Sequence, residues 1–312
     1  MKPKSNHHST LFSPFHIGQW PFWIVAGILW VFIKIFSYSY LMRIGKIIGL
    51  IAYHFSFKQR KIASINIQKC FPHYSEQQKL KLLRCCFINM GIGIFETALS
   101  WWASDKSLNK LIHITGQEYI DKALEKKQGL LIFVPHFFSL YLCGRLANLR
   151  YPFGVMFFPP KNAVFRWITE RYMHSAYSFA VRRNDARGLI KALKNNNAVF
   201  YTPDTDPGKR FGEFVPFFGV PAKTLTATGR FAQLTNCAVL PLDYFRREDG
   251  AGYELRFGPA LNHYPGGDAY QDALRINQMI EKIILSHAEQ YIWQYKRFKT
   301  RPPGEPRFYG RY

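Results

Sequence analysis

Apolar residues dominate one long stretch near the N-terminus. Residues 21–33 (PFWIVAGILWVFI) carry no charge, and beyond Lys34 the apolar character continues to residue 42. At about 1.5 Å per residue, a helix over about 21–42 has the length to cross a bilayer core of about 30 Å. Lys34 lies away from the centre of this helix, where its ammonium can reach water. We therefore predict a membrane anchor that either spans the bilayer or lies in its interface.

Two other interpretations of this stretch are a buried core helix and a cleaved signal peptide. The signal peptide is disfavoured, because the leader before the stretch is long and no small-residue cleavage site follows it. Basic residues come directly after the stretch: they are Arg43, Lys46, Lys58, Arg60 and Lys61. By the positive-inside rule, they predict that this side of the membrane and the rest of the chain are cytoplasmic.

The pattern changes beyond residue 56. Helical spacing covers 57–71 and 76–102, and from residue 112 short apolar runs typical of strands alternate with helical spacing. We expect strands at 112–115, 130–134, 153–158, 198–201, 238–245 and 253–257, and helices at 117–127, 186–194, 226–234 and 269–290. This alternation predicts an α/β fold with a central sheet flanked by helices. No linker is evident, so we expect an N-terminal membrane anchor over 1–56 and one α/β domain over 57–312.

Composition and charge narrow the classes of function. The chain has 312 residues, 42 Lys+Arg against 20 Asp+Glu, a net charge of +22 and 48% hydrophobic residues, which excludes a disordered chain. Nine basic residues precede the first acid, Glu76. This charge implies an anionic partner: nucleic acid, an anionic membrane or an acidic protein. The aromatic content of 17% favours the membrane, and we find no nucleic-acid-binding motif. The five cysteines show no spacing typical of a metal site and are expected to be reduced, buried thiols.

The sharpest chemical signal is a histidine at the end of a predicted strand. The apolar run 130–134 is followed by Pro135 and His136. Active sites of open α/β sheets lie at such strand ends, and histidine can act as a general base near neutral pH. A structural histidine, satisfied by its neighbours, is the alternative interpretation. The position at the strand end favours a functional role for His136.

Several short motifs accompany this histidine in a fixed order. They are the LFSP at 11–14, Asn66 with 70–72 (CFP), Glu96-Thr97 before Trp101-Trp102, Thr115-Gly116, 201–204 (YTPD), 214–219 (FVPFFG), 226–229 (TATG), 290–293 (QYIW) and 297–302 (RFKTRP). In this order and at this spacing, the chain resembles the lysophospholipid acyltransferase-like superfamily. Within it, the chain resembles the late acyltransferases of lipid A biosynthesis (the lauroyl and myristoyl acyltransferases). The resemblance extends over nearly the whole sequence.

The resemblance implies a fold, a reaction and a location. The fold is an α/β domain behind a membrane-associated N-terminus. The reaction is transfer of a fatty acyl chain from an acyl carrier protein thioester to a hydroxyl of a 3-hydroxyacyl chain on a lipid A precursor. It takes place at the cytoplasmic face of the inner membrane of a Gram-negative bacterium. The implied partners are acyl carrier protein, the lipid A precursor and the anionic membrane surface, and no metal or organic cofactor is implied.

The same resemblance implies a catalytic arrangement from which this chain departs. His136 matches the family base, but the acid that follows five positions later in the family is replaced by Tyr141. A tyrosine brings no negative charge to orient the ring. Asp204 and Asp206, in a loop after a predicted strand, are the candidates to replace the acid. Asp204 also matches a family aspartate, and its alternative interpretation is a loop or cap residue.

A second departure concerns a functional arginine of the family. Its position is occupied here by Met173, and Arg171 lies two residues earlier, as a substitute or as a surface charge. Further cations are candidates to contact lipid phosphates or the acidic carrier protein, or are solvated surface residues: they are Lys209, Arg210, Lys296, Arg297, Lys299 and Arg301. The run 214–220 (FVPFFGV) lines an acyl-chain tunnel or belongs to the core. Glu96, a lone acid in an apolar stretch, is expected to have a buried partner.

Four functions stay open from the sequence. The first is lipid A acyl transfer with His136 as base and Asp204 or Asp206 as its partner. The second is transfer of another acyl group, such as an aminoacyl unit, to the same lipid class. The third is a noncatalytic paralogue that binds lipid A or acyl carrier protein, because the acid at Tyr141 is missing. A nucleic-acid binder, suggested by charge alone, is the fourth.

Overall fold

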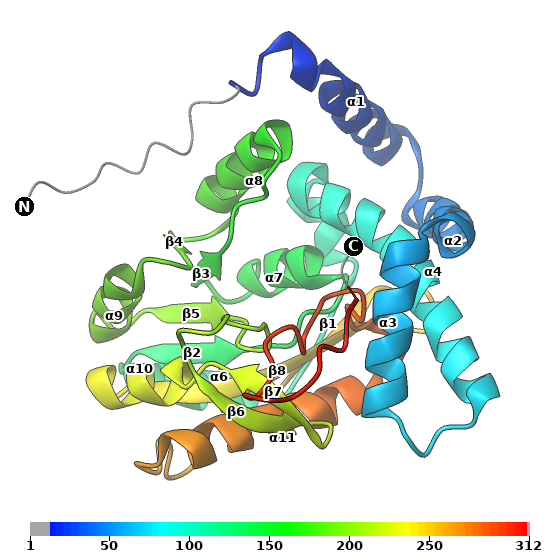
Figure 1. Ribbon diagram of the computed structural model, residues 1–312. Helices are drawn as coiled ribbons and strands as arrows, with labels where there is room; N and C mark the ends of the chain where they lie inside the picture. Colours follow the sequence, from blue (N-terminus) through cyan, green and yellow to red (C-terminus); the bar gives the residue numbers. More distant parts are fainter. Residues whose placement is uncertain (1–12, 311–312) are drawn as a thin grey trace, which may run out of the picture.

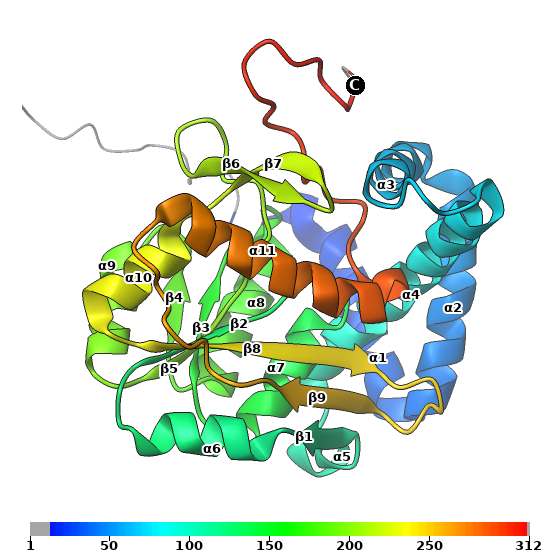
Figure 2. The ribbon, with the colours of Figure 1, turned by 90° about the horizontal axis from the view of Figure 1, so that it is seen from below.

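A seven-stranded sheet forms the centre of the computed structural model, which describes residues 13–310 (Figures 1 and 2). Its order is β1-β9-β8-β2-β5-β3-β4. The strands are β1 (Ile112–Thr115), β2 (Leu130–Phe133), β3 (Gly154–Phe157), β4 (Ala180–Arg182), β5 (Ala198–Tyr201), β8 (Ala238–Arg246) and β9 (Tyr253–Phe257). The five strands β8, β2, β5, β3 and β4 run parallel to one another, whereas β9 and β1 run in the opposite direction. The predicted α/β fold with a central sheet is therefore confirmed.

Helices cover both faces of this sheet. In Figure 1, α7 lies on one side of it and α10 with α11 on the other. The helices that follow the first strand are α6 (Gln117–Glu125), α7 (Leu140–Asn148), α8 (Ala163–Ala176), α9 (Ala186–Lys194), α10 (Ala227–Thr235) and α11 (Ala269–Ser286). The expected helix over 269–290 ends earlier, and a short 3-10 helix, η2 (Ala288–Gln290), follows it. The central strands β2 and β5 are buried along their whole length, as their continuous apolar sequences require.

The predicted single apolar helix over about 21–42 is wrong. The chain instead forms a 3-10 turn, η1 (Ile17–Gln19), then α1 (Trp20–Ile35) and α2 (Tyr38–Phe55), with extended backbone at Phe36 and Ser37 between them. Lys34 Nζ donates a hydrogen bond to the carbonyl of Trp102, 3.0 Å away. Its charge thus meets the C-terminal end of α4 (Glu76–Trp102), where a cation is favourable. Lys2 and Lys4, and Leu11 of the LFSP motif, lie outside the described residues.

Helix α2 is held against α4 by an unusually close backbone approach. A Cβ added at Gly91 of α4 would lie 2.2 Å from the carbonyl oxygen of Gly45, and one added at Gly49 would lie 2.3 Å from that of Phe87. Only glycine fits such a crossing, so these positions allow α2 to lie closely against α4. The break at Phe36 and Ser37 separates this closely packed helix from α1, and the continuous apolar pattern does not reveal it.

Two further helices complete the N-terminal half: α3 (Phe57–Cys70) and the short α5 (Asp105–Asn109). Two helices are long and apolar enough to cross a membrane by length and composition, over Ile17–Ile35 and Glu76–Trp102. The second is mostly buried inside the protein and serves as a core helix, whereas the first is largely exposed. The division of the chain at residue 56 stays a prediction.

The run 214–220 lies in a two-stranded hairpin, β6 (Glu213–Phe217) and β7 (Val220–Thr224). Val215 and Phe217 are fully buried in it, and a role of this run in lining an acyl-chain tunnel stays a prediction. The hairpin's turn residues Phe218 and Gly219 both have positive φ, the geometry that suits tight hairpins. Asn277 of α11 donates to the carbonyl of Pro216 and so holds the hairpin to the body. This hairpin carries the surface against which the C-terminal segment packs.

Candidate active site

The register of two neighbouring strands brings His136 and Asp204 together. In the parallel pair β2 and β5, Phe133 lies opposite Tyr201, and the amide of Val134 still bonds the carbonyl of Tyr201. His136 and Asp204 each come three residues after these paired positions. Both side chains therefore leave the same edge of the sheet at the same level, which is where ligands bind in open α/β sheets.

Asp204 holds His136 through two hydrogen bonds. Nδ1 of the ring lies 2.5 Å from Oδ1 of Asp204, and the backbone amide of His136 donates to Oδ2 at 2.9 Å. The Asp204 side chain is fully buried, whereas 28% of the His136 side chain is exposed. With its proton on Nδ1, the ring has a lone pair on Nε2, and Nε2 makes no hydrogen bond within residues 13–310. The pair thus has the orientation of a general base and its carboxylate partner.

The charge of Asp204 is stabilised in its buried position. Burial by itself would raise the pKa of Asp204, but the charge of His136, the hydrogen bonds from its ring and amide and the charge of Arg297 outweigh that effect. The pKa of Asp204 therefore lies below its ordinary value. The carboxylate therefore stays ionised at neutral pH.

Main-chain contacts from two distant segments fix the turn that carries His136. The hydroxyl of Tyr244, on β8, donates to the carbonyl of Pro135 at 2.6 Å and accepts from the amide of Phe137 at 3.0 Å. The carbonyl of His136 accepts from the amide of Ile292, and the amide of Phe138 donates to the carbonyl of Gln290. The 290–293 motif therefore pairs with the histidine turn. Tyr244 was not predicted, because nothing in the sequence near it reveals this contact.

The other two candidates for the partner of His136 lie elsewhere. Asp206 accepts from the amide and hydroxyl of Thr300 at 2.7 and 2.9 Å and from the amide of Gly208, so it ties the loop to the C-terminal segment. No hydrogen bond joins Tyr141 to His136 among the described residues. Burial raises the pKa of Tyr141, so its hydroxyl stays neutral, and its carbonyl accepts from Tyr172. Of the three, the structure brings only Asp204 to the ring.

Arg171 lies on α8, on the rim of an aromatic groove. Its guanidinium carbon is 5.6 Å from the ring centre of Trp167, and Met173 is buried in the core below. The groove is about 370 Å³ and runs between α1, the end of α4 and α8; its large lining residues are Trp23, Trp30, Trp101, Trp102, Trp167 and Tyr172. We call it the tryptophan groove. Trp101 and Trp102 are half-buried here.

The remaining cations fall into two groups. Lys209 and Arg210 are exposed in the loop after Asp204, and Lys299 is exposed near the C-terminus. Arg301, in contrast, donates to the carbonyl of Pro221, pairs with Glu305 and lies 3.8 Å from the centre of the Phe308 ring. Its charge is committed within the protein, and so is that of the buried Arg297, which bonds Lys223 and Thr224. Arg301 is therefore held by contacts within the protein, and its role as a substrate contact stays a prediction.

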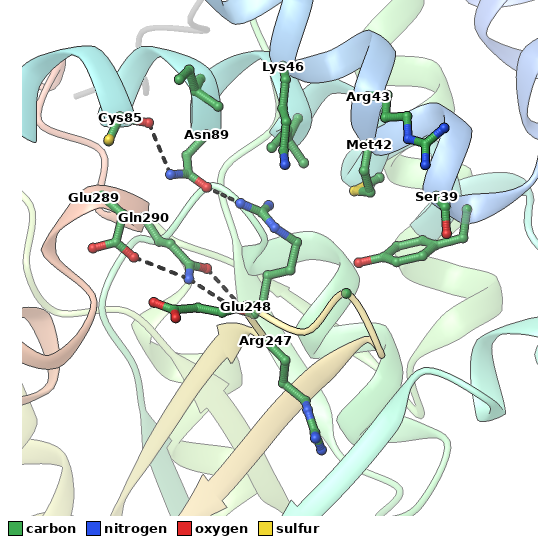
Figure 3. A pocket seen from close by; sticks show the side chains of 15 residues that line it. Ser39, Met42, Arg43, Lys46, Cys85, Asn89, Arg247, Glu248, Glu289 and Gln290 are labelled. Atoms are coloured by element: carbon green, nitrogen blue, oxygen red, sulfur yellow. Dashed lines mark hydrogen bonds between the residues drawn. The ribbon is translucent and has the colours of Figure 1, made fainter. Parts of the chain in front are cut away.

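Glu96 has the buried partner that the sequence predicted. Its Oε1 accepts from Arg246 Nη1 at 2.7 Å and from the hydroxyl of Tyr253 at 2.8 Å. The same guanidinium also bonds Asn89, as Figure 3 shows. Above this network lies a cavity of about 440 Å³ between α2, α4, η2 and the turn after β8. Its charged lining residues are Arg43, Lys46, Arg246, Arg247, Glu248 and Glu289, so cations and acids face one another across it.

Within residues 13–310, no group of three His, Cys, Asp or Glu side chains has the geometry of a metal site. All five cysteines are free, and burial raises the pKa of the thiols of Cys70, Cys86 and Cys143. They are inert thiols rather than nucleophiles.

Comparisons with known proteins agree over nearly the whole chain. Residues 9–300 match the family model described as bacterial lipid A biosynthesis acyltransferase. The chain is 33% identical over 295 residues to the lipid A biosynthesis lauroyltransferase of Escherichia coli (strain K12), which covers 94% of this chain and 96% of that protein. It is 32% identical, with the same coverage, to the palmitoleoyltransferase of that organism. A crystal structure of the 1-acyl-sn-glycerophosphate acyltransferase from Thermotoga maritima is similar with a TM-score of 0.39 and 13% identity, covering 84% of this chain and 96% of that one. The chain belongs to the bacterial lipid A biosynthesis acyltransferase family.

Proposed function

We propose that the protein transfers a fatty acyl chain from an acyl carrier protein thioester to a hydroxyl of a 3-hydroxyacyl chain on a lipid A precursor. The observation that carries the proposal is the His136–Asp204 pair, with Nδ1 bonded to a buried carboxylate and Nε2 available. Membership of the family supports the substrate class. The alternative of a noncatalytic paralogue rested on the missing acid at Tyr141, and Asp204 supplies that charge.

The reaction needs one base. Nε2 of His136 takes the proton of the acceptor hydroxyl as its oxygen attacks the thioester carbonyl. The tetrahedral intermediate collapses, the carbon–sulfur bond breaks, and the proton on Nε2 passes to the departing thiolate. Asp204 remains ionised throughout and stabilises the imidazolium that forms between these two steps.

The exposed faces of the protein support a place at the membrane. Helix α1 has 16 residues, about 24 Å at about 1.5 Å per residue, which is shorter than a bilayer core of about 30 Å. It packs on α4 and α8, while residues along its outer side are exposed and apolar: they are Trp20, Ile24, Val25, Ile28, Val31 and Ile35. We propose that this face lies in the cytoplasmic leaflet of the inner membrane, with the α/β domain in the cytoplasm.

Lys209 and Arg210 extend the proposal to the donor. They are exposed in the loop that begins with Asp204, so they lie on the same sheet edge as His136. An acidic carrier protein that delivers its thioester to His136 would pass beside them, and opposite charge would steer that encounter. Lys299 is a third exposed cation near this loop, because Thr300 bonds Asp206.

The test is an acyl-transfer assay with purified protein, acyl carrier protein thioesters and defined lipid A precursors, followed by mass spectrometry of the lipid. We expect the lipid to gain the mass of one fatty acyl chain and His136→Ala to abolish the gain. Full activity of the variant would overturn the base assignment. A mass gain that matches an aminoacyl unit would indicate transfer of that group instead of a fatty acyl chain. Thioesters that stay intact with wild-type protein would indicate a noncatalytic paralogue.

A further inference from the structure

The tryptophan groove is the feature that the proposed chemistry leaves unused. Five of the seven tryptophans of the chain line it, together with Arg171 and Tyr172. Its volume of about 370 Å³ falls in the range of small-molecule sites, which is roughly 300–1,000 Å³. A groove whose large lining side chains are mostly indole rings is suited to a hydrocarbon chain. We propose that it holds one acyl chain of the phosphorylated acceptor lipid.

The groove opens where the membrane is expected. Helix α1 forms one wall, through Trp23, Gly27 and Trp30, and the outer side of the same helix is the apolar face proposed to enter the leaflet. Trp30 is 47% exposed and Trp167 36% exposed, so aromatic surface continues from the membrane-facing side to the mouth of the groove. A lipid chain can pass sideways from the leaflet into the groove without crossing a polar barrier.

A hydrogen bond links the wall of the groove to the helix that follows the catalytic turn. Tyr172 lines the groove and donates to the carbonyl of Tyr141 at 3.2 Å. Tyr141 is the second residue of α7, and the turn that carries His136 leads directly into this helix. The groove and the histidine turn are therefore connected through α7 and α8.

Arg171 supplies the charge that such a lipid requires. It is exposed at the rim and has no carboxylate partner among residues 13–310, since the nearby Glu170 is paired with Arg182. Its guanidinium carbon lies 5.6 Å from the centre of the Trp167 ring, and such a cation–π contact does not use up the N–H donors of the guanidinium. Arginine binds phosphate through paired hydrogen bonds, so Arg171 is suited to a lipid phosphate above the buried chain.

The charge at the rim favours a phosphorylated lipid over a plain hydrocarbon, because Arg171 lies beside the indole rings that line the groove. The acceptor of the proposed reaction carries both acyl chains and phosphate, and in this respect the inference rests on the proposed function.

The inference is tested by photo-crosslinking, which needs no acyl transfer. The probe is a phosphatidic acid with a diazirine at the end of one acyl chain, in phosphatidylcholine vesicles. We expect crosslinks on Trp101, Trp102 and α8 as well as on α1, both in wild-type protein and in His136→Ala. Crosslinks confined to the outer faces of α1 and α2 would overturn the groove. Because His136→Ala is expected to crosslink as wild type, failure of the groove is distinguishable from failure of the proposed reaction.

A matched pair of variants locates the chain within the groove. A Cβ at Gly27 meets no atom within 4 Å, so Gly27→Phe places a ring in the groove without backbone strain. We expect crosslinks to Trp101, Trp102 and α8 to fall roughly tenfold, which corresponds to about 1.4 kcal/mol of lost contact. Ile28→Phe adds a similar ring on the exposed side of α1 and is expected to leave them unchanged. Equal crosslinking in all three proteins would contradict the proposal.

The phosphate contact is tested with a second probe. A diacylglycerol with the same diazirine chain lacks the phosphate. We expect wild-type protein to crosslink phosphatidic acid more strongly than diacylglycerol, and Arg171→Gln to remove that preference while it retains the crosslinks to diacylglycerol. A preference that survives Arg171→Gln would show that another group binds the phosphate and would overturn this part of the inference.

Discussion

Two buried carboxylates, Asp204 and Glu96, each pair with a basic side chain, and the two basic side chains differ in what they can still do. The ring of His136 is partly exposed, and its Nε2 makes no hydrogen bond within residues 13–310. Arg246 is bonded by both Glu96 and Asn89 and keeps its charge at any ordinary pH. A buried charged pair by itself therefore does not identify an active site. A titratable nitrogen left available at the carboxyl edge of the sheet does.

The largest expected effect is on the turnover number, which should depend on the His136–Asp204 pair and not on the other charged contacts. Asp204→Asn keeps the size of the side chain but removes the charge, and we expect the turnover number to fall roughly 10³–10⁴-fold, as in other carboxylate–histidine sites. Asp206→Asn is the matched control two residues away, because Asp206 bonds Thr300 rather than the histidine. Steady-state acyl transfer measures both. Equal losses of turnover in Asp204→Asn and Asp206→Asn would contradict a specific role of Asp204 beside His136.

The second prediction concerns the Arg246–Glu96 pair, which should matter for the stability of the fold rather than for turnover. Glu96→Gln leaves the guanidinium of Arg246 without its buried counter-charge, and we expect the free energy of unfolding to fall by about 3 kcal/mol. Denaturant unfolding followed by circular dichroism measures the change. Asp249→Asn removes the partner of Arg247 at the surface and serves as the control, with no measurable loss expected. A stable Glu96→Gln protein with impaired turnover would argue that Arg246 acts in catalysis.

A third prediction uses the pH dependence of Asp204. Because its folded pKa lies below the ordinary carboxyl value of about 4, the ionised form stabilises the fold above that pH. The contribution is lost as pH falls through the folded pKa. We expect Asp204→Asn to be less stable than wild type at pH 7 by about 2 kcal/mol, and the difference to shrink below about pH 4. A difference that stays constant to pH 3 would contradict the lowered pKa.

The smallest expected effect is at Tyr141, the position where the resemblance implies an acid. Tyr141→Phe removes only a hydroxyl that makes no hydrogen bond to His136, and we expect the turnover number to stay within about twofold, a change below 0.5 kcal/mol. Tyr141→Glu is not expected to raise activity, because Asp204 already occupies Nδ1. A marked gain in Tyr141→Glu would show that the ring lacks a sufficient carboxylate partner.

Much of the fold was predictable, because periodicity depends on local sequence. The strands at 112–115, 198–201 and 253–257 and the helix at 186–194 have the predicted bounds. The way α1 and α2 pack on α4 was not predictable, since it involves the contact of Gly45 with Gly91 and the bond from Lys34 to Trp102. Both contacts join residues more than forty positions apart.

The candidate site also has residues that the sequence predicted and residues that only the structure reveals. His136 was found from its place after an apolar strand, and Asp204 only as one of two candidates. The choice between Asp204 and Asp206 depends on the register of β2 with β5, which places residues 136 and 204 at one level. Tyr244 and Arg246 lie on β8, and their roles come from pairing with distant segments. Such contacts leave no periodic trace in the sequence.

The most direct test of the central claim is a double-mutant cycle on the rate of acyl transfer. It compares wild type, His136→Ala, Asp204→Asn and the double variant with one thioester and one lipid acceptor. If Asp204 acts through His136, the double variant retains the same residual rate as His136→Ala alone. If the two losses multiply in the double variant, the residues act independently, and the account of a base oriented by its buried carboxylate is wrong.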